Sequence, residues 1–597
     1  LPTMAKKNTK KTKKRLSSAE ISQRNEQRNQ KKEICDILKN IGFEKLSYID
    51  GKEFNYEGRT SELDDIFIFE NVILLTEYTI GDPHLLKKSI FYDRVNSDKK
   101  AFINFMLQEE KLSSFKKYYQ DNIKDKYSIN QLRVKILYCS KKSISEEHKS
   151  VVNDVIYFDY HIVQYFKSLT KVIKKSSKYE FLEFIGIPFN EFGENILGSG
   201  HISINKFSGH ILPEEKSSFK EGYKIVSFYI DAESLIKRAY VLRQEGWREK
   251  ENIGYYQRMF EAKKISSMRK YLTENSRVFI NNIISTIAEN QIKLFDRKGN
   301  PIIINDKGEF EGDNASTNVT PALIEINDEC NIIGLIDGQH RTYAYHEGDD
   351  IYEPHIAKLR KIQNLLVTGI LFPQKESKES RLKFEANLFL EINLNQTKVK
   401  PKLQQEIELM ITPFSNIAIG KRILKGLNSN GPLSNLIEQY SFEKGKIKTA
   451  SIVSFGLKPL IKLDDIKSKD SLYSLWENQD KARLKERKSE EYQILNEYIS
   501  FCITKIRDLL IAFKSELSSD KWETYTPQNP NGMLNVTFIN GVLNVLRLLI
   551  ENNKISDIQN YKEKLKDIDK FDFKKYKSSQ YRKMGKDIYA KYFENAI

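Results

Sequence analysis

Apolar residues near the N-terminus change from helical spacing to strand-like runs. Residues 32–41 carry apolar side chains every three or four positions, which predicts a helix that ends before Gly42. Between residues 61 and 79, two runs rich in β-branched and aromatic residues flank Glu70 and Asn71. This arrangement predicts a β-hairpin with its turn at those two residues.

Strands and helices continue to alternate up to about residue 190. Residues 133–139 and 154–159 have the composition of short strands, and residues 160–169 have the spacing of a helix. Strands interleaved with helices favour a mixed sheet. Glycines and a proline gather between residues 185 and 200, so we expect a domain boundary there.

A strand, a tight turn and a helix follow one another in the middle of the chain. Residues 332–336 form a short apolar run, Asp337-Gly338 reads as the turn, and a helix is expected to start near His340. Backbone N–H groups and the helix dipole make such a corner a cradle for an anion. We predict that His340 and Arg341 close around a phosphate, and an ordinary structural corner is the alternative.

Helical spacing dominates after residue 400, whereas residues 384–392 just before it read as a strand. The last patterned segment, residues 573–583, interleaves aromatic and basic side chains. That mixture suits stacking and phosphate contacts on nucleic acid, and a docked terminal helix is the alternative. The expected helices of this region cover residues 402–412, 432–440, 491–517 and 538–553.

Carboxylates stand at both ends of the predicted hairpin. Glu62 and Asp64 precede its first strand, and Glu77 lies near the end of its second. These positions are neighbours in an antiparallel pair joined by a tight turn. Asp64 and Glu77 are therefore candidates to hold a divalent cation, Mg²⁺ or Mn²⁺, through oxygen ligands. Such a cation activates water for phosphodiester cleavage.

A helix followed by this hairpin resembles the core of the PD-(D/E)XK nucleases. The three carboxylates keep that family's spacing of Glu-x-Asp, about a dozen residues, then Glu-x-Lys, but Thr79 stands at the lysine position. The resemblance implies that the lysine orients the attacking water or stabilises developing negative charge. We expect Lys87 or Lys88 to replace it. The alternatives are a degenerate nuclease that only binds DNA and a hairpin with solvent-exposed carboxylates.

The stretch Asp337-Gly338-Gln339-His340-Arg341-x-x-Ala344 resembles the signature of the DGQHR-domain proteins. That family includes the DndB regulators of DNA phosphorothioate modification and belongs to the ParB/sulfiredoxin-like class. Residues 256–268 and 389–399 fit the same family in the same order. The resemblance implies a ParB-like core that binds a nucleotide or DNA phosphate. Its binding residues would be Asp337, Gly338, Gln339, His340, Arg341, Gln257, Arg258 and Asn395.

Length and composition limit the class of protein. A chain of 597 residues with 40% hydrophobic residues is long enough for two or three domains. Neither a run long enough to span a membrane nor a secretory leader is visible in the sequence. The four cysteines are scattered, as is typical of reduced thiols. We therefore expect a cytoplasmic protein without a membrane partner.

The net charge of +16 is concentrated at the N-terminus. Residues 1–32 contain eleven Lys and Arg against two Glu, so +9 of the charge lies there. A segment this polar cannot bury a core, and we expect a basic tail that is disordered or loosely helical. It would grip DNA phosphates without reading sequence, or simply keep the protein soluble.

Together these patterns predict an α/β (α+β) protein. Its expected parts are a basic disordered tail (1–30), a PD-(D/E)XK nuclease-like domain with a mixed sheet (31–190), a DGQHR ParB-like domain (200–400) and a helical C-terminal region (401–597).

The expected function is that of a bacterial DNA-processing or antiphage defence protein. In this hypothesis a metal-dependent DNA endonuclease is gated by the DGQHR domain. The alternatives are a DndB-like DNA-binding regulator and an NTP hydrolase in DNA modification. The expected partners are DNA, with modified DNA as a variant, and a nucleoside triphosphate; a homo-oligomer remains open.

Overall fold

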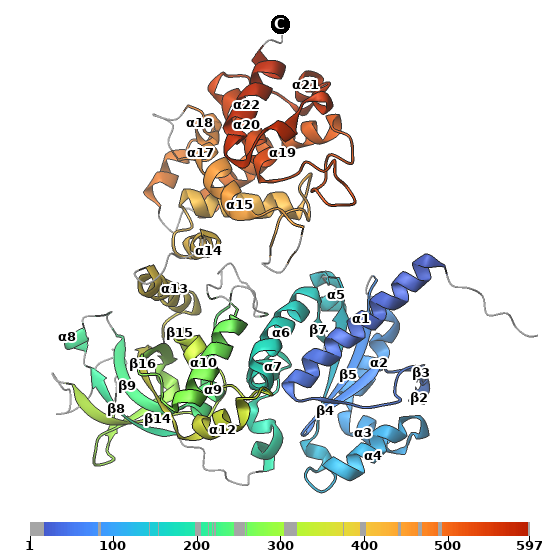
Figure 1. The fold of residues 1–597 in the computed structure, drawn as a ribbon, viewed down its shortest axis with the longest axis vertical. Coiled ribbons are helices and arrows are strands. Elements are labelled where there is room, and N and C mark those ends of the chain that lie inside the picture. The colour runs from blue at the N-terminus through green and yellow to red at the C-terminus, as the bar shows by residue number, and fades with distance from the viewer. Residues whose placement is uncertain are drawn as a thin grey trace, which may run out of the picture. The chain divides into compact units, whose positions relative to one another are not determined.

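The chain folds into two compact units, one mixed and one mainly helical (Figure 1). The first unit comprises residues 1–240 and 259–371, and the second comprises residues 241–258 and 372–597. The α/β (α+β) class expected from the sequence is confirmed. The computed structural model describes residues 17–81, 85–142, 144–152, 155–197, 205–212, 214–217, 219, 222–243, 247, 257, 259–303, 319–373, 375–394, 401–439, 443, 445–463, 469–487 and 492–594.

No helix in these described ranges is both long enough and apolar enough to cross a lipid bilayer.

The first unit begins with a five-stranded mixed sheet. In this sheet β4 runs antiparallel to both neighbours, and β5, β6 and β7 run parallel to one another. The predicted hairpin is confirmed as β4 and β5, and the strands expected over residues 133–139 and 154–159 are confirmed as β6 and β7. The order is β1 (Glu44–Lys45), β4 (Asp65–Phe69), β5 (Val72–Thr79), β6 (Arg133–Ser140) and β7 (Val155–Phe158).

Helices cover both faces of this sheet (Figure 1). Ile73 and Leu75 of β5 pack into a core with Phe91 and Phe102 on one face. On the other face the ring of Phe69 lies 5.4 Å from that of Phe43. The helices on the first face are α2 (Leu85–Ser97), α3 (Lys99–Gln108) and α4 (Ser113–Tyr118); those on the second are α1 (Ser18–Ile41), α6 (Tyr160–Ile173) and α7 (Lys178–Phe184).

Helix α1 begins earlier than expected. Of the two alternatives for the tail, disordered or helical, residues from Ser18 onward adopt the helical one, so a disordered tail up to residue 30 needs correction there. Ser17 and Glu20 form a capping box, with the Ser17 N–H 2.8 Å from the Glu20 carboxylate, so the first N–H groups of the helix have partners. Residues 20–29 are exposed, and the helix packs against the unit only from Gln30 onward.

A nine-stranded sheet forms the rest of the first unit. The strands β10 and β15 pair in parallel, whereas β15 pairs with β11 in antiparallel fashion. The sheet order is β10 (Ala239–Tyr240), β15 (Ile333–Asp337), β11 (Ile283–Ala288), β16 (Asn364–Phe372), β9 (Lys224–Asp231), β8 (Lys206–Leu212), β14 (Thr320–Ile326), β12 (Ile292–Phe295) and β13 (Pro301–Ile302). The helices that accompany it are α9 (Ala232–Arg238), α10 (Ala262–Asn275), α11 (Gln339–Tyr343) and α12 (Glu353–Ile362).

Helices beside the five-stranded sheet contact loops of the nine-stranded sheet within this unit. The Glu347 N–H donates to Ser176 Oγ at 2.8 Å, and the Glu347 carboxylate lies 3.0 Å from Lys178 Nζ. Asn331 Nδ2 donates to the carbonyl oxygen of Tyr179 at 3.1 Å. The boundary expected at residues 185–200 therefore separates two sheets but not two compact units.

The second unit is built from helices around one large apolar core. Residues 384–392, expected as a strand, lie inside helix α13 (Lys378–Leu394), so that prediction is wrong. Leu382 and Ala386 are both buried and lie one helical turn apart. Because residues 384–392 do not include Leu382, that run alone does not show the helical spacing. The other long helices are α14 (Pro401–Ile411), α15 (Asn416–Ser429), α19 (Tyr492–Glu516), α20 (Val536–Glu551) and α22 (Tyr581–Tyr589).

Two further expectations for this unit need correction. Residues 432–440 do not form the predicted helix, because Asn435 adopts a left-handed conformation (φ 59°) that a helix interior does not allow. In the segment 573–583, Phe573 and Tyr576 are buried in the core. Their rings are therefore not available as a stacking platform for bases, whereas the basic side chains around them are exposed.

Candidate functional site

The open end of the β4–β5 hairpin gathers the predicted carboxylates. The register pairs Asp65 with Thr76, so the next two positions, Asp64 and Glu77, face each other across the strands. Glu77 is 4% exposed, and the Asp64 side chain is 26% exposed. The carboxylate of Asp64 accepts a hydrogen bond from the Tyr78 N–H at 3.0 Å, which holds it at the strand end.

Lys88 of helix α2 reaches this group from the next element of the chain. Its Nζ lies 2.5 Å from Glu77 Oε2 and donates to the carbonyl oxygen of Glu62 at 3.2 Å. Lys88 thus places an amine beside Glu77, where the nuclease pattern has a lysine and this chain has Thr79. The side chain of Lys87 lies outside the described part of the chain. Glu62 contributes its backbone oxygen to the contact and exposes its carboxylate.

Helix α1 supplies two residues that the sequence did not point to. Gln30 Nε2 donates to the carbonyl oxygens of Thr79 at 3.0 Å and Cys139 at 3.1 Å, which joins the ends of β5 and β6. Lys31 Nζ lies 3.1 Å from Asp64. The sequence could have indicated Gln30, because it precedes the apolar Ile34 by four residues and so lies on the side of the helix that packs against the protein.

The environment of Glu77 disfavours a bare negative charge. Burial raises its pKa to about 7; the Lys88 amine opposes that rise, and the charges of Asp64 and Glu62 add to it. Glu77 Oε1 is buried and has no hydrogen-bond partner in the described structure. A buried carboxylate oxygen without a partner needs positive charge or a proton beside it.

These donors fit a hard divalent cation. Carboxylate oxygens are ligands that Mg²⁺ and Mn²⁺ accept, and Asp64 and Glu77 are the side chains that would hold such an ion. Within the described ranges no group of three or more His, Cys, Asp and Glu side chains is arranged around a common metal position. A cation here would therefore take its other ligands from backbone carbonyls and water.

We expect cation binding to depend on pH through Glu77. Because the pKa of Glu77 is raised from 4.5 to about 7, the folded protein favours the protonated form, and stability from this group is lost as pH rises from 4.5 to about 7. Mn²⁺ must displace that proton below pH 7. Calorimetry should therefore show affinity about tenfold weaker at pH 6 than at pH 8.

The matched variants are Glu77→Gln, which should lose both the binding and its pH dependence, and Glu53→Gln, an exposed carboxylate that should behave as wild type. Equal Mn²⁺ affinity in wild type and Glu77→Gln would exclude this cation site.

The signature stretch forms the corner that the sequence predicted. β15 ends at Asp337, Gly338 turns the chain with φ 96°, and the five-residue helix α11 follows. A Cβ on Gly338 would lie 2.9 Å from Ile283 Cγ1 and 3.2 Å from Arg341 Nη2. The glycine is therefore required both by its backbone conformation and by close packing.

Side chains of the corner bind one another. Arg341 Nη2 donates to Asp337 Oδ2 at 2.9 Å and to the carbonyl oxygen of Asn282 at 2.8 Å. Asp337 thus pairs with Arg341 and makes no side-chain cap of α11. His340 Nε2 accepts the Glu261 N–H at 3.2 Å, which ties the corner to the start of α10.

Several buried polar atoms of the corner have no partner in the described structure. They belong to side chains of the signature and of the loop before β11, and a bound polar ligand would satisfy them. These atoms are Gln339 Oε1, Arg341 Nε, Thr342 Oγ1 and Asn282 Oδ1. Helix α10 also borders a shallow hollow of about 510 Å³, lined by Ala262, Lys263, Ser266, Ser267, Lys270 and Tyr352.

The other residues assigned by resemblance are not described as part of the corner. Gln257 belongs to the second unit, where its N–H donates to the carbonyl oxygen of Leu242 at 2.9 Å. Arg258 and Asn395 lie outside the described residues. Among the described residues of the first unit, those from Asp337 to Thr342 and Asn282 form the corner.

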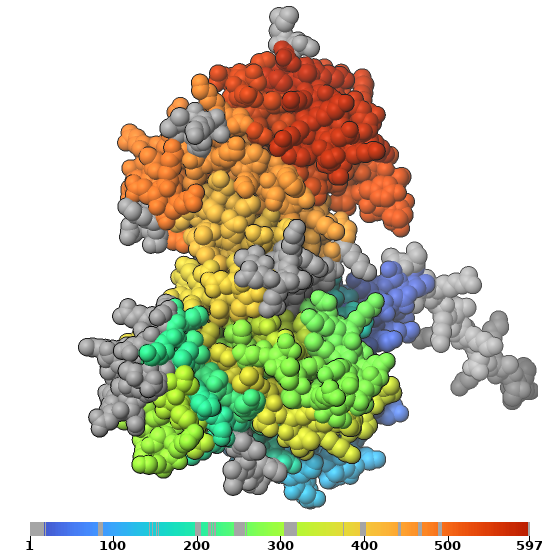
Figure 2. Space-filling model, turned by 60° about the vertical axis from the view of Figure 1, so that its left-hand side comes forward, coloured from blue at the N-terminus to red at the C-terminus, as the bar shows by residue number. Residues whose placement is uncertain are grey.

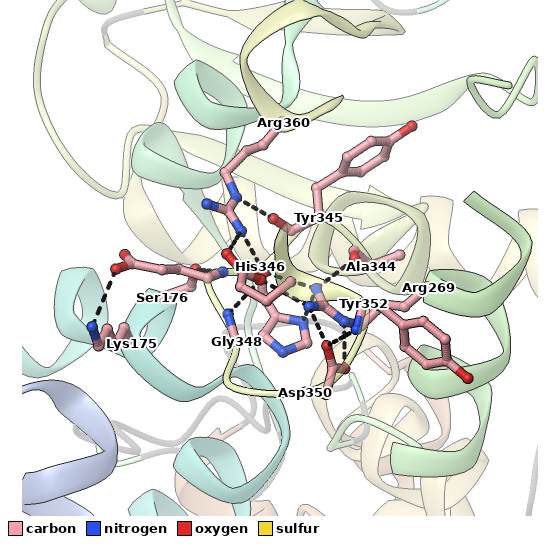
Figure 3. A network of polar contacts seen from close by, with 12 residues as sticks. Lys175, Ser176, Arg269, Ala344, Tyr345, His346, Gly348, Asp350, Tyr352 and Arg360 are labelled. Atoms are coloured by element: carbon pink, nitrogen blue, oxygen red, sulfur yellow. Dashed lines mark hydrogen bonds and ion pairs between the residues drawn. The ribbon is translucent and has the colours of Figure 1, made fainter. Parts of the chain in front are cut away.

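A buried ionic network holds the segment after α11 (Figure 3). Arg269 of α10 donates to both carboxylate oxygens of Asp350 at 2.8 Å and to the carbonyl oxygen of His346 at 2.8 Å. Arg360 of α12 donates to the same carbonyl at 2.8 Å, and Glu353 binds both guanidinium groups. Burial, with the Arg269 charge beside it, lowers the pKa of His346 to about 3, so this imidazole stays neutral.

Comparisons of this chain with protein-family models, with curated proteins and with solved structures find no match. The two family resemblances therefore remain predictions carried by the residues quoted for them.

The ion pair in the corner leads to a second prediction. Arg341→Ala should weaken nucleotide or phosphate binding by about 1.5–3 kcal/mol, the scale of a charge-assisted hydrogen bond. It should also lower the free energy of unfolding by about 1–2 kcal/mol, because Asp337 loses its partner. Titration calorimetry with ATP, GTP and CTP, together with a melting curve, measures both effects.

Asp337→Asn provides the matched comparison, since it breaks the same ion pair but keeps the guanidinium. If both variants lose stability and neither changes binding, the corner has a structural role alone.

Proposed function

We propose that this protein is a metal-dependent DNA endonuclease whose reaction centre is the open end of the β4–β5 hairpin. The observation that carries the proposal is the contact of the Lys88 amine, at 2.5 Å, with the buried carboxylate of Glu77. Asp64 faces Glu77 across the strands. Two carboxylates and an amine at a strand end are the groups that phosphodiester hydrolysis uses.

Each side chain has a distinct task in this proposal. Asp64 and Glu77 would hold Mg²⁺ or Mn²⁺, which when bound polarises a phosphate oxygen and lowers the pKa of water. The Lys88 amine lies beside Glu77, where it can donate to the attacking water or to a phosphate oxygen that gains negative charge. Gln30 joins the ends of β5 and β6 and so steadies the strand that carries Glu77.

The rest of the chain supports DNA as the substrate. The net charge of +16 favours association with a polyanion. The corner from Asp337 to Thr342 presents buried polar atoms without partners, which suits a nucleotide or a DNA phosphate that gates the reaction. A role in bacterial DNA processing or antiphage defence, with modified DNA among the targets, follows from the DGQHR resemblance.

A DNA-binding regulator without cleavage is the second candidate. It is favoured by one observation: the carboxylate of Asp64 already accepts hydrogen bonds from Lys31 and the Tyr78 N–H. In this candidate the lysines permanently neutralise the carboxylates, and the hairpin end serves as a binding surface. An NTP hydrolase centred on Arg341 has weaker support, because that guanidinium folds back onto Asp337.

A nicking assay distinguishes the nuclease from the regulator. Purified protein should convert supercoiled plasmid to nicked or linear DNA with Mg²⁺ or Mn²⁺, and should not do so after the cation is chelated. Asp64→Asn and Glu77→Gln should each abolish cleavage while leaving the melting temperature close to that of wild type. Persistent cutting by the double variant would exclude this site, and cutting by neither wild type nor variants would favour the regulator.

The role of Lys88 can be measured separately. Lys88→Ala should lower the cleavage rate by about 10²–10³, the cost of losing one preorganised donor to developing charge. Lys100→Ala removes an exposed lysine of α3 and should leave the rate unchanged. A rate for Lys88→Ala within threefold of wild type would show that the amine only neutralises Glu77.

A further inference from the structure

The first half of helix α1 extends beyond the body of the first unit. Figure 1 shows this helix, in blue, running past the edge of the five-stranded sheet, and its surface is also visible in Figure 2. Every residue from 20 to 29 is exposed, which corresponds to about 15 Å of helix with no packed side. A helix in that position gains nothing from burial.

The residues of this projecting half are almost entirely polar. Ile21 is its one large apolar side chain, and it is 47% exposed. A helix that is polar on all sides is stabilised by charge pairs along its surface or by a partner. The charge of Arg24 interacts with Glu20 one turn earlier, which is the one charge interaction between residues 20 and 29 that the described structure shows. The exposed, polar surface therefore favours a partner that is not apolar.

One side of the helix connects this half to the candidate reaction centre. Gln23, Arg24, Gln27 and Arg28 precede Gln30 or Lys31 by three, four or seven residues, so all six lie on one side. We call these four residues the α1 stripe. Gln30 and Lys31 contact Thr79 and Asp64 at the hairpin end, so the stripe starts where the carboxylates are.

The opposite side of the helix has a different composition. It carries Ser22, Asn25, Glu26 and Asn29, without a basic residue. Between residues 20 and 29 the basic residues are thus confined to the stripe side, where Glu20 adds one acidic group. Residues 1–16 add seven Lys and Arg with no acidic residue. This distribution is complementary to a polyanion that approaches the stripe side.

We infer that the α1 stripe is a DNA-reading element that enters the major groove of duplex DNA. A single helix fits that groove, where Arg makes two-pronged contacts with guanine O6 and N7 and Gln does the same with adenine N6 and N7. The stripe consists of these two residue types alone. This inference rests on the proposed function, because DNA read there would pass the carboxylates of Asp64 and Glu77.

The side chains also argue against a lipid surface. An interfacial helix needs an apolar face of several large residues, and this segment has Ile21 alone. Sequence readout needs no apolar face. Specificity for cleavage would then come from a helix distinct from the residues that hold the cation.

The test compares two double variants of the full chain. The first, Arg24→Ala with Arg28→Ala, removes two stripe residues. The second, Asn25→Ala with Asn29→Ala, is the matched control, because it introduces the same number of alanines on the opposite side of the helix. Neither pair is buried, and alanine favours helix, so both should keep the wild-type melting temperature. Fluorescence anisotropy with a 30-base-pair duplex is measured without divalent cations, so the result does not depend on cleavage.

We expect the stripe variant to bind at least tenfold more weakly and the opposite-side variant to bind within twofold of wild type. Replacing every guanine by 7-deazaguanine removes N7 from the major groove, and replacing guanine by inosine removes the amino group from the minor groove. The first duplex should weaken wild-type binding and the second should not.

Two outcomes would overturn the inference: stripe and opposite-side variants that bind DNA alike, or a wild type that is insensitive to 7-deazaguanine. If the plasmid is still cleaved, either result would reject the DNA-reading role of α1 and keep the proposed nuclease activity. If the binding results are as expected but the wild-type protein does not cleave DNA, the proposed nuclease activity is rejected and α1 is kept as the DNA contact of a regulator.

Discussion

The buried guanidinium of Arg269 is the constraint on which the signature corner depends. It is fully buried, and it binds Asp350, Glu353 and the carbonyl oxygen of His346. Leaving this buried guanidinium without its partners would cost several kcal/mol of stability. Residues 344–350 are therefore held in the one conformation that keeps those hydrogen bonds. The short helix α11 has too few residues to be stable alone, and its position is set by this anchor and by Gly338.

At the hairpin end the buried charge is only partly compensated, unlike that of Arg269. There a carboxylate is placed where its charge is poorly solvated, and Lys88 compensates for it only in part, because the pKa of Glu77 remains near 7. A group poised in this way exchanges a proton for a cation at small cost near neutral pH. The Arg269 network is thus held by paired charges, whereas the hairpin end keeps a buried carboxylate whose pKa is raised.

Local patterns predicted the elements that local interactions determine. The β4–β5 hairpin and the strand that ends at Asp337 follow from short runs and turn residues, and the reach of Lys88 was one of two options. Helix α13 was missed because residues 384–392, the run that was read, leave out Leu382, whose spacing from Ala386 shows the helical period. The Arg269 network could not be predicted, because its partners are about 80 residues away and only the fold makes them neighbours.

The contact of Glu347 with Ser176 and Lys178 has a consequence for how such a chain can evolve. It joins the segment anchored by Arg269 to the helices behind the five-stranded sheet. An exchange of genetic material near residue 190 would leave the carboxylate of Glu347 facing a foreign surface that lacks its amine. A signature corner transplanted from another protein would therefore need a helix with matching partners for Glu347 to be carried across with it.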